Sequence, residues 1–328
     1  MKLFKKIVVT LLVVLVTLFT AFAIVMVRPN LSLEELEPTY FTSASHYLDV
    51  TIQDLEGNDL SLTMHYQDWG EEEDPVVVLV HGAFSSSHTF LEWTDRLVEE
   101  GYRVILPDLP YFGLSGGFED YVTSYRRSAA TIKYLLDTLE VDAIDIAGNS
   151  LGGGVSWFFA SEYPSMVRSL TLVDAMYPYV EQGGRDSIQA ITQYDGLTNF
   201  ISTLTPKFLL KALLSTAYGD PERLSDEIVQ RYYDIIRKEG TRKAILKVIQ
   251  EEEPEFTYQA RLESLTMDVY VMWGDLDTWI NPSYITSFKN TIGIPEDHIY
   301  TYETLGHLPM EEDPTATVSD YLDILQEI

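Results

Sequence analysis

Five short apolar runs, with amphipathic segments between most of them, limit what this chain can fold into. The runs are residues 75–80, 103–106, 143–147, 170–173 and 269–273. A strand that is apolar along its whole length is buried on both faces, and such strands belong to parallel sheets covered by helices. Helical patterns separate the first four runs, at residues 90–100, 124–139 and 151–162. The alternation predicts an α/β fold with a mostly parallel, doubly wound sheet.

Two further segments complete the expected domain. Residues 47–53 and 59–66 alternate apolar and polar side chains around the turn Glu56-Gly57-Asn58, which predicts a β-hairpin before the first buried strand. Between about 175 and 263 only helical patterns remain, at 206–217, 225–238 and 241–252. Thr205 is the expected N-cap of the first of these helices, and Pro206 its first residue. Because ligands bind at the carboxyl ends of parallel strands, we expect this insertion to form a lid there.

The first 28 residues predict a membrane anchor. Lys2, Lys5 and Lys6 precede an uncharged, mostly apolar run over 7–27, about 31 Å long as a helix and sufficient to cross a bilayer core. The lysines favour a cytoplasmic N-terminus, which would leave the rest of the chain on the outer face. The alternative is a cleaved signal peptide and a secreted protein, because Ala21-Phe22-Ala23 fits a cleavage site. Residues 29–45 are an expected linker, and residues 46–328 the folded domain.

Charge and cysteine content exclude several functions. The chain has 51 acidic and 22 basic residues, for a net charge of −29, which argues against nucleic-acid binding. It has no cysteine, so a thiol nucleophile, a disulfide and a thiolate metal site are excluded. No two of the six histidines form an HExxH pair. We expect no metal and no organic cofactor, and the oligomeric state stays open.

Residues 144–154 carry the clearest chemical signal. The strand pattern leads into Gly148-Asn-Ser150-Leu-Gly152 and then into an apolar helix, so a serine stands at the apex of a tight turn. The glycines allow the chain to cross closely, and the helix N-terminus favours an anion beside Ser150. A second GxSxG, at 113–117, lies in a loop with no helix after it, so Ser115 is expected to have only a turn role. Ser150 is the predicted nucleophile.

A serine hydroxyl needs a base to take its proton, and the base needs an acid to orient it. Asp277 follows the strand at 269–273, and His307 follows the last strand, so serine, acid and histidine occur in the order that a parallel sheet requires. Asp277 is preferred to Asp275, which suits a turn. Asp174, after the strand at 170–173, is the other candidate acid.

The oxyanion hole needs two backbone amides directed at the developing charge. Leu151, directly after the nucleophile, is one expected donor. Ala83, just after the first buried strand, is the best second donor. His81 is expected to hold this loop by hydrogen bonds.

Together these motifs resemble those of the α/β-hydrolase fold. The resemblance rests on His81-Gly-Ala-Phe, Pro107-Asp-Leu-Pro-Tyr-Phe-Gly-Leu-Ser115, Gly148-Asn-Ser-Leu-Gly-Gly153, Trp273-Gly-Asp-Leu-Asp277 and Gly306-His-Leu-Pro-Met-Glu311. It spans about residues 46–328 and is closest to bacterial lipases and carboxylesterases with a GNSxGG elbow and, in layout, to membrane-anchored monoacylglycerol lipases. It implies the same roles for Ser150, Asp277, His307, Ala83 and Leu151. Tyr111 departs from the pattern, since relatives often carry glycine there, which leaves the shape of this loop open but does not affect the triad.

The resulting hypothesis is a membrane-tethered serine hydrolase that cleaves small-molecule or lipid carboxylic esters through an acyl-enzyme. The helical insertion would be a lid that shapes an acyl pocket. Ordinary packing between lid helices is the preferred interpretation for any single apolar residue of the insertion, and the candidates for lining the pocket are Tyr177, Tyr179, Phe200, Phe208, Leu209 and Leu210. Serine at the elbow argues against epoxide hydrolases and haloalkane dehalogenases. Two alternatives remain. One is another reaction on the same fold, by a C–C bond hydrolase, a cofactor-free haloperoxidase or an aminopeptidase, and the other is a non-catalytic anchored scaffold.

Overall fold

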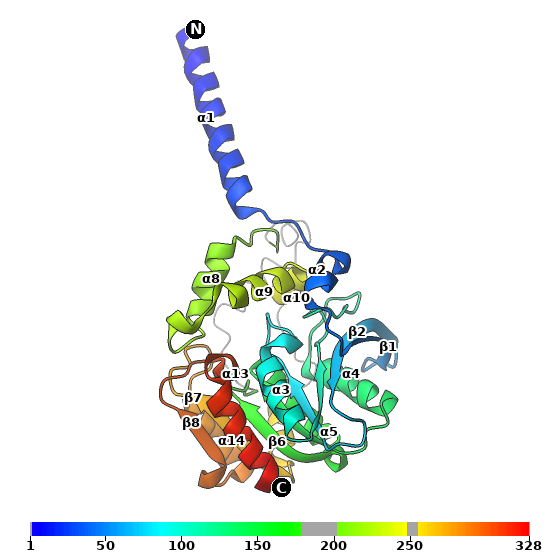
Figure 1. Ribbon diagram of the computed structural model, residues 1–328. Helices are drawn as coiled ribbons and strands as arrows, with labels where there is room; N and C mark the ends of the chain where they lie inside the picture. Colours follow the sequence, from blue (N-terminus) through cyan, green and yellow to red (C-terminus); the bar gives the residue numbers. More distant parts are fainter. Residues whose placement is uncertain (1, 179–201, 248–254, 328) are drawn as a thin grey trace.

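The computed structural model describes residues 2–178, 202–247 and 255–327, and its centre is a sheet of eight strands (Figure 1). The strand order is β1-β2-β4-β3-β5-β6-β7-β8. β2 runs antiparallel to β1 and to β4, and all other neighbours are parallel. The strands are β1 (Ser45–Gln53), β2 (Asp59–Trp69), β3 (Val76–Val80), β4 (Arg103–Pro107), β5 (Ile144–Asn149), β6 (Val167–Val173), β7 (Asp268–Gly274) and β8 (Ile299–Tyr302).

The sheet confirms the expected α/β class and the hairpin that precedes the first parallel strand. β3, β4 and β5 are buried at every position, as their continuous apolar runs predict. β1 and β2 pair from Ser45 with Gln67 to Gln53 with Asp59, around the predicted turn. The hairpin alternates buried and exposed residues because one of its faces lies in water.

Helices cover both faces of the sheet. α4 and α5 bury Leu135 and Phe159 in the same apolar cluster as Val78 and Ile146. On the opposite face, α3 and α14 bury Trp93 and Tyr321, whose rings stack at 5.0 Å. The helices of the described segments are α1 (Lys2–Met26), α2 (Leu33–Tyr40), α3 (Leu91–Glu99), α4 (Tyr125–Thr138), α5 (Leu151–Glu162), α8 (Lys207–Ser215), α9 (Asp226–Ile236), α10 (Thr241–Lys247), α11 (Glu255–Glu263), α12 (Ser283–Phe288), α13 (Pro309–Glu312) and α14 (Pro314–Glu327).

Between β6 and β7 the described residues contain the helices α8, α9, α10 and α11 and add no strand to the sheet. We call this segment the insert. α8 starts one residue later than predicted, at Lys207, because Pro206 keeps an extended ψ of 137° and acts as the cap residue itself. In Figure 1, α8, α9 and α10 lie between the sheet and the base of α1.

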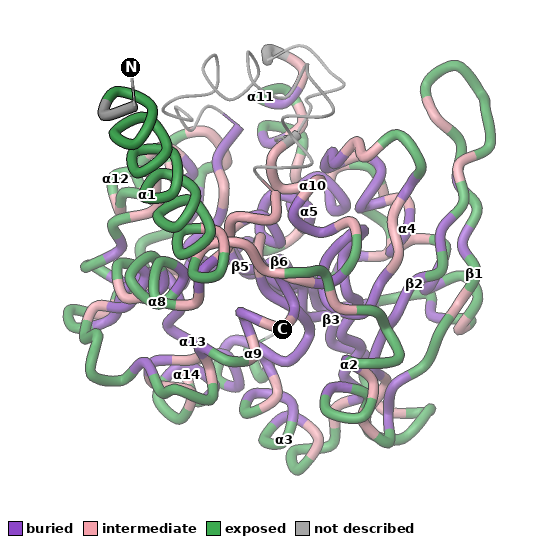
Figure 2. The backbone as a smooth tube through the Cα atoms, turned by 90° about the horizontal axis from the view of Figure 1, so that it is seen from above, coloured by how far each residue is buried: buried purple, intermediate pink, exposed green. Residues whose placement is uncertain are grey.

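The N-terminal region contains the expected apolar helix, but the segment after it is more structured than a linker. Residues 4–26 form a helix with a mean hydropathy of 2.9, long and apolar enough to cross a membrane. The expected linker after it contains a helix, α2, whose Leu36 and Tyr40 are buried against Leu114 and Ile235. Seen from above in Figure 2, α1 is exposed along its length, whereas the residues that follow it lie on the domain.

Candidate active site

Ser150 stands at the sharp turn between β5 and α5. Its φ of 55° and ψ of −119° lie in a region that side chains rarely adopt. The amide of Ser150 donates to the carbonyl of Val173 at 3.1 Å, which fixes the turn against β6. A Cβ at Gly152 would lie 2.1 Å from the carbonyl oxygen of Val80, so no larger residue fits there. The predicted strained elbow is therefore present, with the serine at its apex.

The structure joins His307 to Asp277. His307 Nδ1 and Asp277 Oδ2 lie 2.7 Å apart, and both residues are buried. The other carboxylate oxygen, Oδ1, accepts hydrogen bonds from the amides of Trp279 at 2.7 Å and Ile280 at 2.9 Å. These bonds hold Asp277 in one orientation, so that it fixes the imidazole ring of His307. Asp275 lies in the turn after β7, where its amide donates to Tyr302 at 3.0 Å.

Asn149 connects the serine turn to the histidine loop. Its Nδ2 donates to the carbonyl oxygens of His307 at 3.0 Å and of Val173 at 3.2 Å. The histidine loop is fixed from the other side, because the amide of His307 donates to Ala217 of the insert at 2.6 Å. Ser150, Asp277 and His307 thus lie beyond the carboxyl ends of β5, β7 and β8, at one edge of the sheet. The sequence contained no signal for the part that Asn149 plays.

Asp174 lies beside Asp277 and is fully buried. Its Oδ1 accepts a hydrogen bond from the amide of Gly274 at 3.0 Å, while Oδ2 has no partner among the described residues. Burial, and then the negative charge of Asp277, raise the pKa of Asp174 well above its usual value. Asp277, and not Asp174, is the carboxyl group that contacts His307.

One group of side chains in the described segments could surround a metal ion. Ligand atoms of Asp174, Asp277 and His307 lie within 4.8 Å of one another. His307 and Asp277 are already bonded to each other, so a metal ion would have to replace their contact. The arrangement suits proton transfer better than metal binding.

The loop after β3 lies against Ser150. A Cβ at Gly82 would lie 3.1 Å from the Cβ of Ser150, so the main chain at residues 82–83 passes directly beside Ser150. His81 holds this loop by hydrogen bonds, as expected. Its Nε2 accepts a hydrogen bond from the amide of Leu109 at 3.0 Å. In a neutral imidazole the other nitrogen then carries the proton, so Nδ1 donates to the carbonyl of Gly82 at 2.7 Å. Burial lowers the pKa of His81, in keeping with a neutral ring. The amide of Leu151, at the first position of α5, has no acceptor within its own helix.

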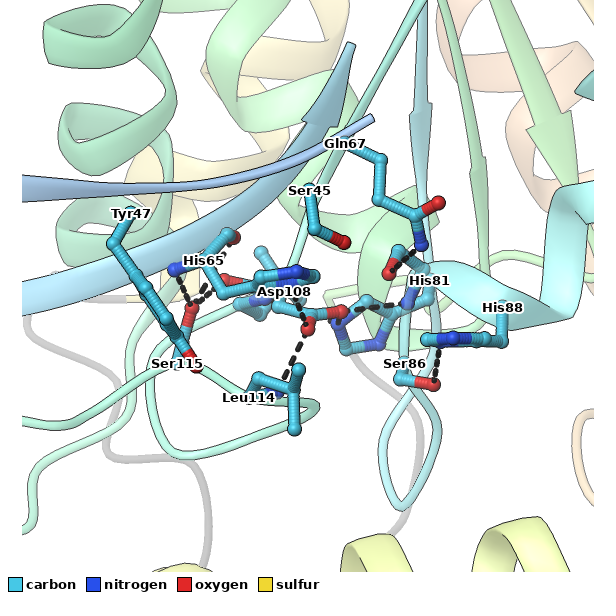
Figure 3. A network of polar contacts seen from close by, with 12 residues as sticks. Ser45, Tyr47, His65, Gln67, His81, Ser86, His88, Asp108, Leu114 and Ser115 are labelled. Carbon is cyan, nitrogen blue, oxygen red and sulfur yellow. Dashed lines mark hydrogen bonds and ion pairs between the residues drawn. The ribbon is translucent and has the colours of Figure 1, made fainter. Parts of the chain in front are cut away.

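The second GxSxG serine belongs to a buried structural network around Asp108, which Figure 3 shows from close by. Ser115 Oγ donates to the carbonyl of Asp108 at 2.7 Å and accepts from the amide of His65 at 2.8 Å. His65 Nδ1 lies 2.7 Å from Asp108 Oδ2. Burial alone would raise the pKa of Asp108, but the charges and hydrogen bonds of His65 and its neighbours hold it well below its usual value. Ser115 thus has the structural role that its loop position predicts, whereas no local sequence pattern indicated the His65–Asp108 pair.

Tyr111, the predicted departure in this loop, has a φ of 74°. This left-handed conformation suits glycine best, so the loop has a backbone shape in which a glycine would be expected. Here the tyrosine is retained by contacts: its hydroxyl donates to the carbonyl of Phe118 at 2.9 Å, and its ring stacks on Tyr121 at 5.8 Å.

The candidate pocket residues of the insert differ in their burial. Tyr177 and Leu210 are buried, with the ring of Tyr177 4.9 Å from that of Phe288. Phe208 and Leu209 are 58% and 49% exposed on α8, so neither is packed in the core of the domain. They lie on the side of the helix opposite the buried Leu210 and Leu214. Tyr179 and Phe200 lie outside the described residues.

Comparisons with known proteins agree with this architecture. Residues 75–314 match the model of the α/β hydrolase fold family. A 2-hydroxy-6-oxononadienedioate/2-hydroxy-6-oxononatrienedioate hydrolase of Pseudomonas putida is 28% identical over 84% of this chain and 95% of its own. Lipase 1 of Psychrobacter immobilis is 28% identical over 82% of this chain and 83% of its own.

Solved structures share the fold. An esterase from Thermogutta terrifontis superposes with a TM-score of 0.71 at 22% identity, covering 86% of this chain and 98% of its own. A membrane phospholipase A superposes with a TM-score of 0.66 at 21% identity, covering 100% of this chain and 99% of its own. With the family model matching well over half of its length, this chain belongs to the α/β-hydrolase fold family.

Proposed function

We propose that this protein is a serine hydrolase that cleaves carboxylic esters, with a lipid ester as the substrate class. Ser150, His307 and Asp277 are its proposed catalytic residues. The observation that carries the proposal is the 2.7 Å contact between His307 Nδ1 and Asp277 Oδ2, at the same edge of the sheet as the strained Ser150. Three groups with these roles are what acyl transfer to serine requires.

The chemistry follows from the arrangement of the groups. Nδ1 of His307 is hydrogen-bonded to Asp277, so Nε2 is the nitrogen available to take a proton. It takes the proton from the Ser150 hydroxyl as the serine oxygen attacks the acyl carbonyl. The same proton then passes to the leaving alcohol. The amides of Leu151 and Ala83 stabilise the oxyanion, and water, activated by His307, hydrolyses the acyl-enzyme.

The C–C bond hydrolases among the relatives make that reaction the second candidate, because it uses the same fold. The name of the Pseudomonas putida relative describes a dicarboxylate substrate. A doubly negative substrate is repelled by a chain of net charge −29 and needs basic side chains near the site. Arg231, a buried cation of the insert, is already paired with Glu311. An uncharged ester avoids this repulsion.

An apolar helix of this length supports a membrane location. We propose that α1 stays attached as a single-pass anchor, with the folded domain on the extracytoplasmic side. Its side chains from Phe4 to Val25 are largely exposed, which is costly in water and favourable in lipid. Intact mass of the protein purified from membranes distinguishes an anchor from a signal peptide cleaved after Ala23.

The test compares esters and a C–C substrate on the full-length protein in detergent. We expect hydrolysis of p-nitrophenyl esters from butyrate to palmitate, lost in Ser150→Ala and retained in Ser115→Ala. Ser150-dependent cleavage of a vinylogous 1,5-diketone without ester hydrolysis would favour the second candidate. A folded protein that hydrolyses neither substrate, and is not labelled at Ser150 by a fluorophosphonate, would refute both.

A further inference from the structure

Helix α8 has two apolar faces, and only one of them is covered. Leu210 and Leu214 are buried in the cluster that continues into the sheet. Phe208, Leu209 and Leu213 are 58%, 49% and 45% exposed on the other side. We call these three residues the α8 face. A surface helix of a water-soluble domain normally presents polar residues there, so the α8 face is suited to an apolar environment.

The α8 face lies next to the point where α1 leaves the domain. Val27, directly after α1, forms a β-bridge with Leu204, and the amide of Arg28 donates to Thr203 at 2.8 Å. Residue 204 is three positions before the first residue of α8. Figures 1 and 2 both place α8 beside the base of α1.

The chain between α1 and α2 is held against the insert at a second place. Leu31 donates its amide to the carbonyl of Arg237 at 2.8 Å and accepts from the amide of Glu239 at 3.0 Å. Arg242 also bonds to the side chain of Asn30. Because residues 27–31 are hydrogen-bonded to the insert, the end of the anchor and the start of α8 keep a fixed spacing.

We propose that the α8 face is a membrane-docking surface, whose occupant is the lipid leaflet in which α1 ends. This inference rests on the proposed membrane anchor. The apolar segment of α1 is 23 residues, about 35 Å as a helix, which slightly exceeds the hydrocarbon core and brings Val27 to the headgroup layer. Apolar side chains beside that level enter the boundary between headgroups and acyl chains.

Insertion of apolar side chains, and not charge, drives this docking. The chain carries a net charge of −29, which opposes attraction to anionic lipid. The lysines of α8 are engaged on the protein: Lys207 donates to Gln230 at 2.5 Å, and Lys211 pairs with Asp226 at 2.7 Å. Docking is therefore expected on neutral phosphatidylcholine and to persist in high salt.

The docked helix leads directly to the proposed catalytic histidine. Ala217, two residues after α8, accepts the hydrogen bond from the amide of His307 at 2.6 Å. Thr216 accepts from the indole of Trp279 at 2.9 Å, and the Trp279 ring lies 5.2 Å from that of His307. α8 thus connects the proposed docking surface to the site, so a lipid ester has a short path between them.

The test uses single cysteines, since the chain has none of its own. Full-length Phe208→Cys and Leu213→Cys carry an environment-sensitive NBD label in phosphatidylcholine vesicles that contain nitroxide-labelled lipid. Leu55→Cys is the matched control, because Leu55 is 59% exposed but lies in the β1–β2 turn. Leu15→Cys, within α1, reports on the anchor.

We expect the labels at 208 and 213 to shift to the blue and to be quenched by nitroxides near the headgroups, while the label at 55 is not. Labels at 208 and 213 that behave like the label at 55 would overturn the proposal. Quenching that disappears when the protein is diluted in lipid would also overturn the proposal, because a second copy of the protein, and not lipid, would then cover the α8 face. An unquenched label at 15 would overturn the anchor, and docking with it. Hydrolysis of p-nitrophenyl butyrate in the same samples reports separately on the proposed function.

A second measurement uses polar substitutions that a helix accepts. Phe208→Gln or Leu213→Gln is expected to lower the docked-to-undocked ratio by about five- to tenfold, from the transfer of a half-exposed apolar side chain. Hydrolysis of a long-chain ester in vesicles should fall relative to that of p-nitrophenyl butyrate in solution, and Leu55→Gln should change neither. An equal loss on both substrates would mean a damaged helix and would overturn the proposal.

Discussion

Replacing Asp108 by asparagine tests the buried network behind the loop that follows β3. Its Oδ1 accepts from the amide of Ser87 at 2.6 Å, and its Oδ2 accepts from the amide of Leu114 at 2.8 Å and contacts His65 Nδ1 at 2.7 Å. Asparagine has nearly the same volume but only one oxygen. In either orientation its NH₂ group therefore faces a buried backbone N–H, which loses its acceptor.

The size of the effect follows from these contacts. A hydrogen bond to a charged group contributes about 1.5–3 kcal/mol, and an unsatisfied buried donor costs about 1–3 kcal/mol. We expect Asp108→Asn to lower the free energy of unfolding by about 3–5 kcal/mol, the range found when one partner of a buried pair is removed. Ser115→Ala, which loses neutral hydrogen bonds in the same network, should cost about 1–2 kcal/mol.

The loss should depend on pH in a defined direction. The pKa of Asp108 is lower in the folded state than the unfolded value of about 3.9. The carboxylate therefore stabilises the fold above that unfolded value, and this contribution disappears as the pH falls through the folded pKa. The difference between wild type and Asp108→Asn should be full at pH 7 and should shrink below about pH 4.

Urea unfolding of the full-length protein in detergent, followed by tryptophan fluorescence, measures these changes. Trp93, Trp157 and Trp273 are fully buried, so their emission reports on the folded core. A loss below about 1 kcal/mol at pH 7, no larger than an ordinary hydrogen bond, would refute the reasoning. A difference that stays constant down to pH 3 would refute the role of the charge.

Three other predictions follow from the site. Fluorophosphonate labelling should vanish in Ser150→Ala and persist in Ser115→Ala; labelling that depends on Ser115 would contradict the assignment. Asp174 has a pKa raised in the folded state, so its contribution to stability is present at low pH and is lost as the pH rises through the folded value. Asp174→Asn cannot ionise, and its urea midpoint relative to wild type should therefore rise as the pH increases above the unfolded value of about 3.9; a difference that does not change with pH would contradict the raised pKa of Asp174. Gly152→Ala places a methyl group 2.1 Å from the Val80 carbonyl oxygen and should lower thermal stability by at least about 1–3 kcal/mol, whereas Gly116→Ala, with 3.2 Å to its nearest atom, should cost less.

Much of the fold could be predicted because its signals are local. The buried strands are continuous apolar runs, and α5 begins and ends at the predicted residues, Leu151 and Glu162. The elbow at Ser150 was also readable, because the strand, the glycines and the helix are consecutive in the sequence. Asp277 and His307 could be proposed by their order along the chain, but only the folded structure shows that Asp277, and not Asp174, contacts the histidine.

The missed features depend on residues far apart in the sequence. His65 and Asp108 are separated by 43 residues, and His65 sits in a strand whose alternation gave no reason to expect a charged partner. The linker helix α2 was missed because its apolar residues are few, and its burial comes from Leu114 and Ile235. Asn149 reaches His307 across 158 positions, so its role has no local pattern at all.

Which side of α8 is buried could not be predicted from the sequence, for a more specific reason. Its sequence, KFLLKALLS, is apolar on both faces, so the helical period alone cannot tell which face is buried. The structure places Leu210 and Leu214 inward, which leaves Phe208, Leu209 and Leu213 outward. A flexible tether after α1 would let such a face reach the bilayer only part of the time, whereas residues 27–31 are bonded to the insert on either side of α9. If α1 is the proposed membrane anchor, these contacts of residues 27–31 would fix the orientation of the domain above the bilayer, and with it the direction from which a lipid would reach Ser150.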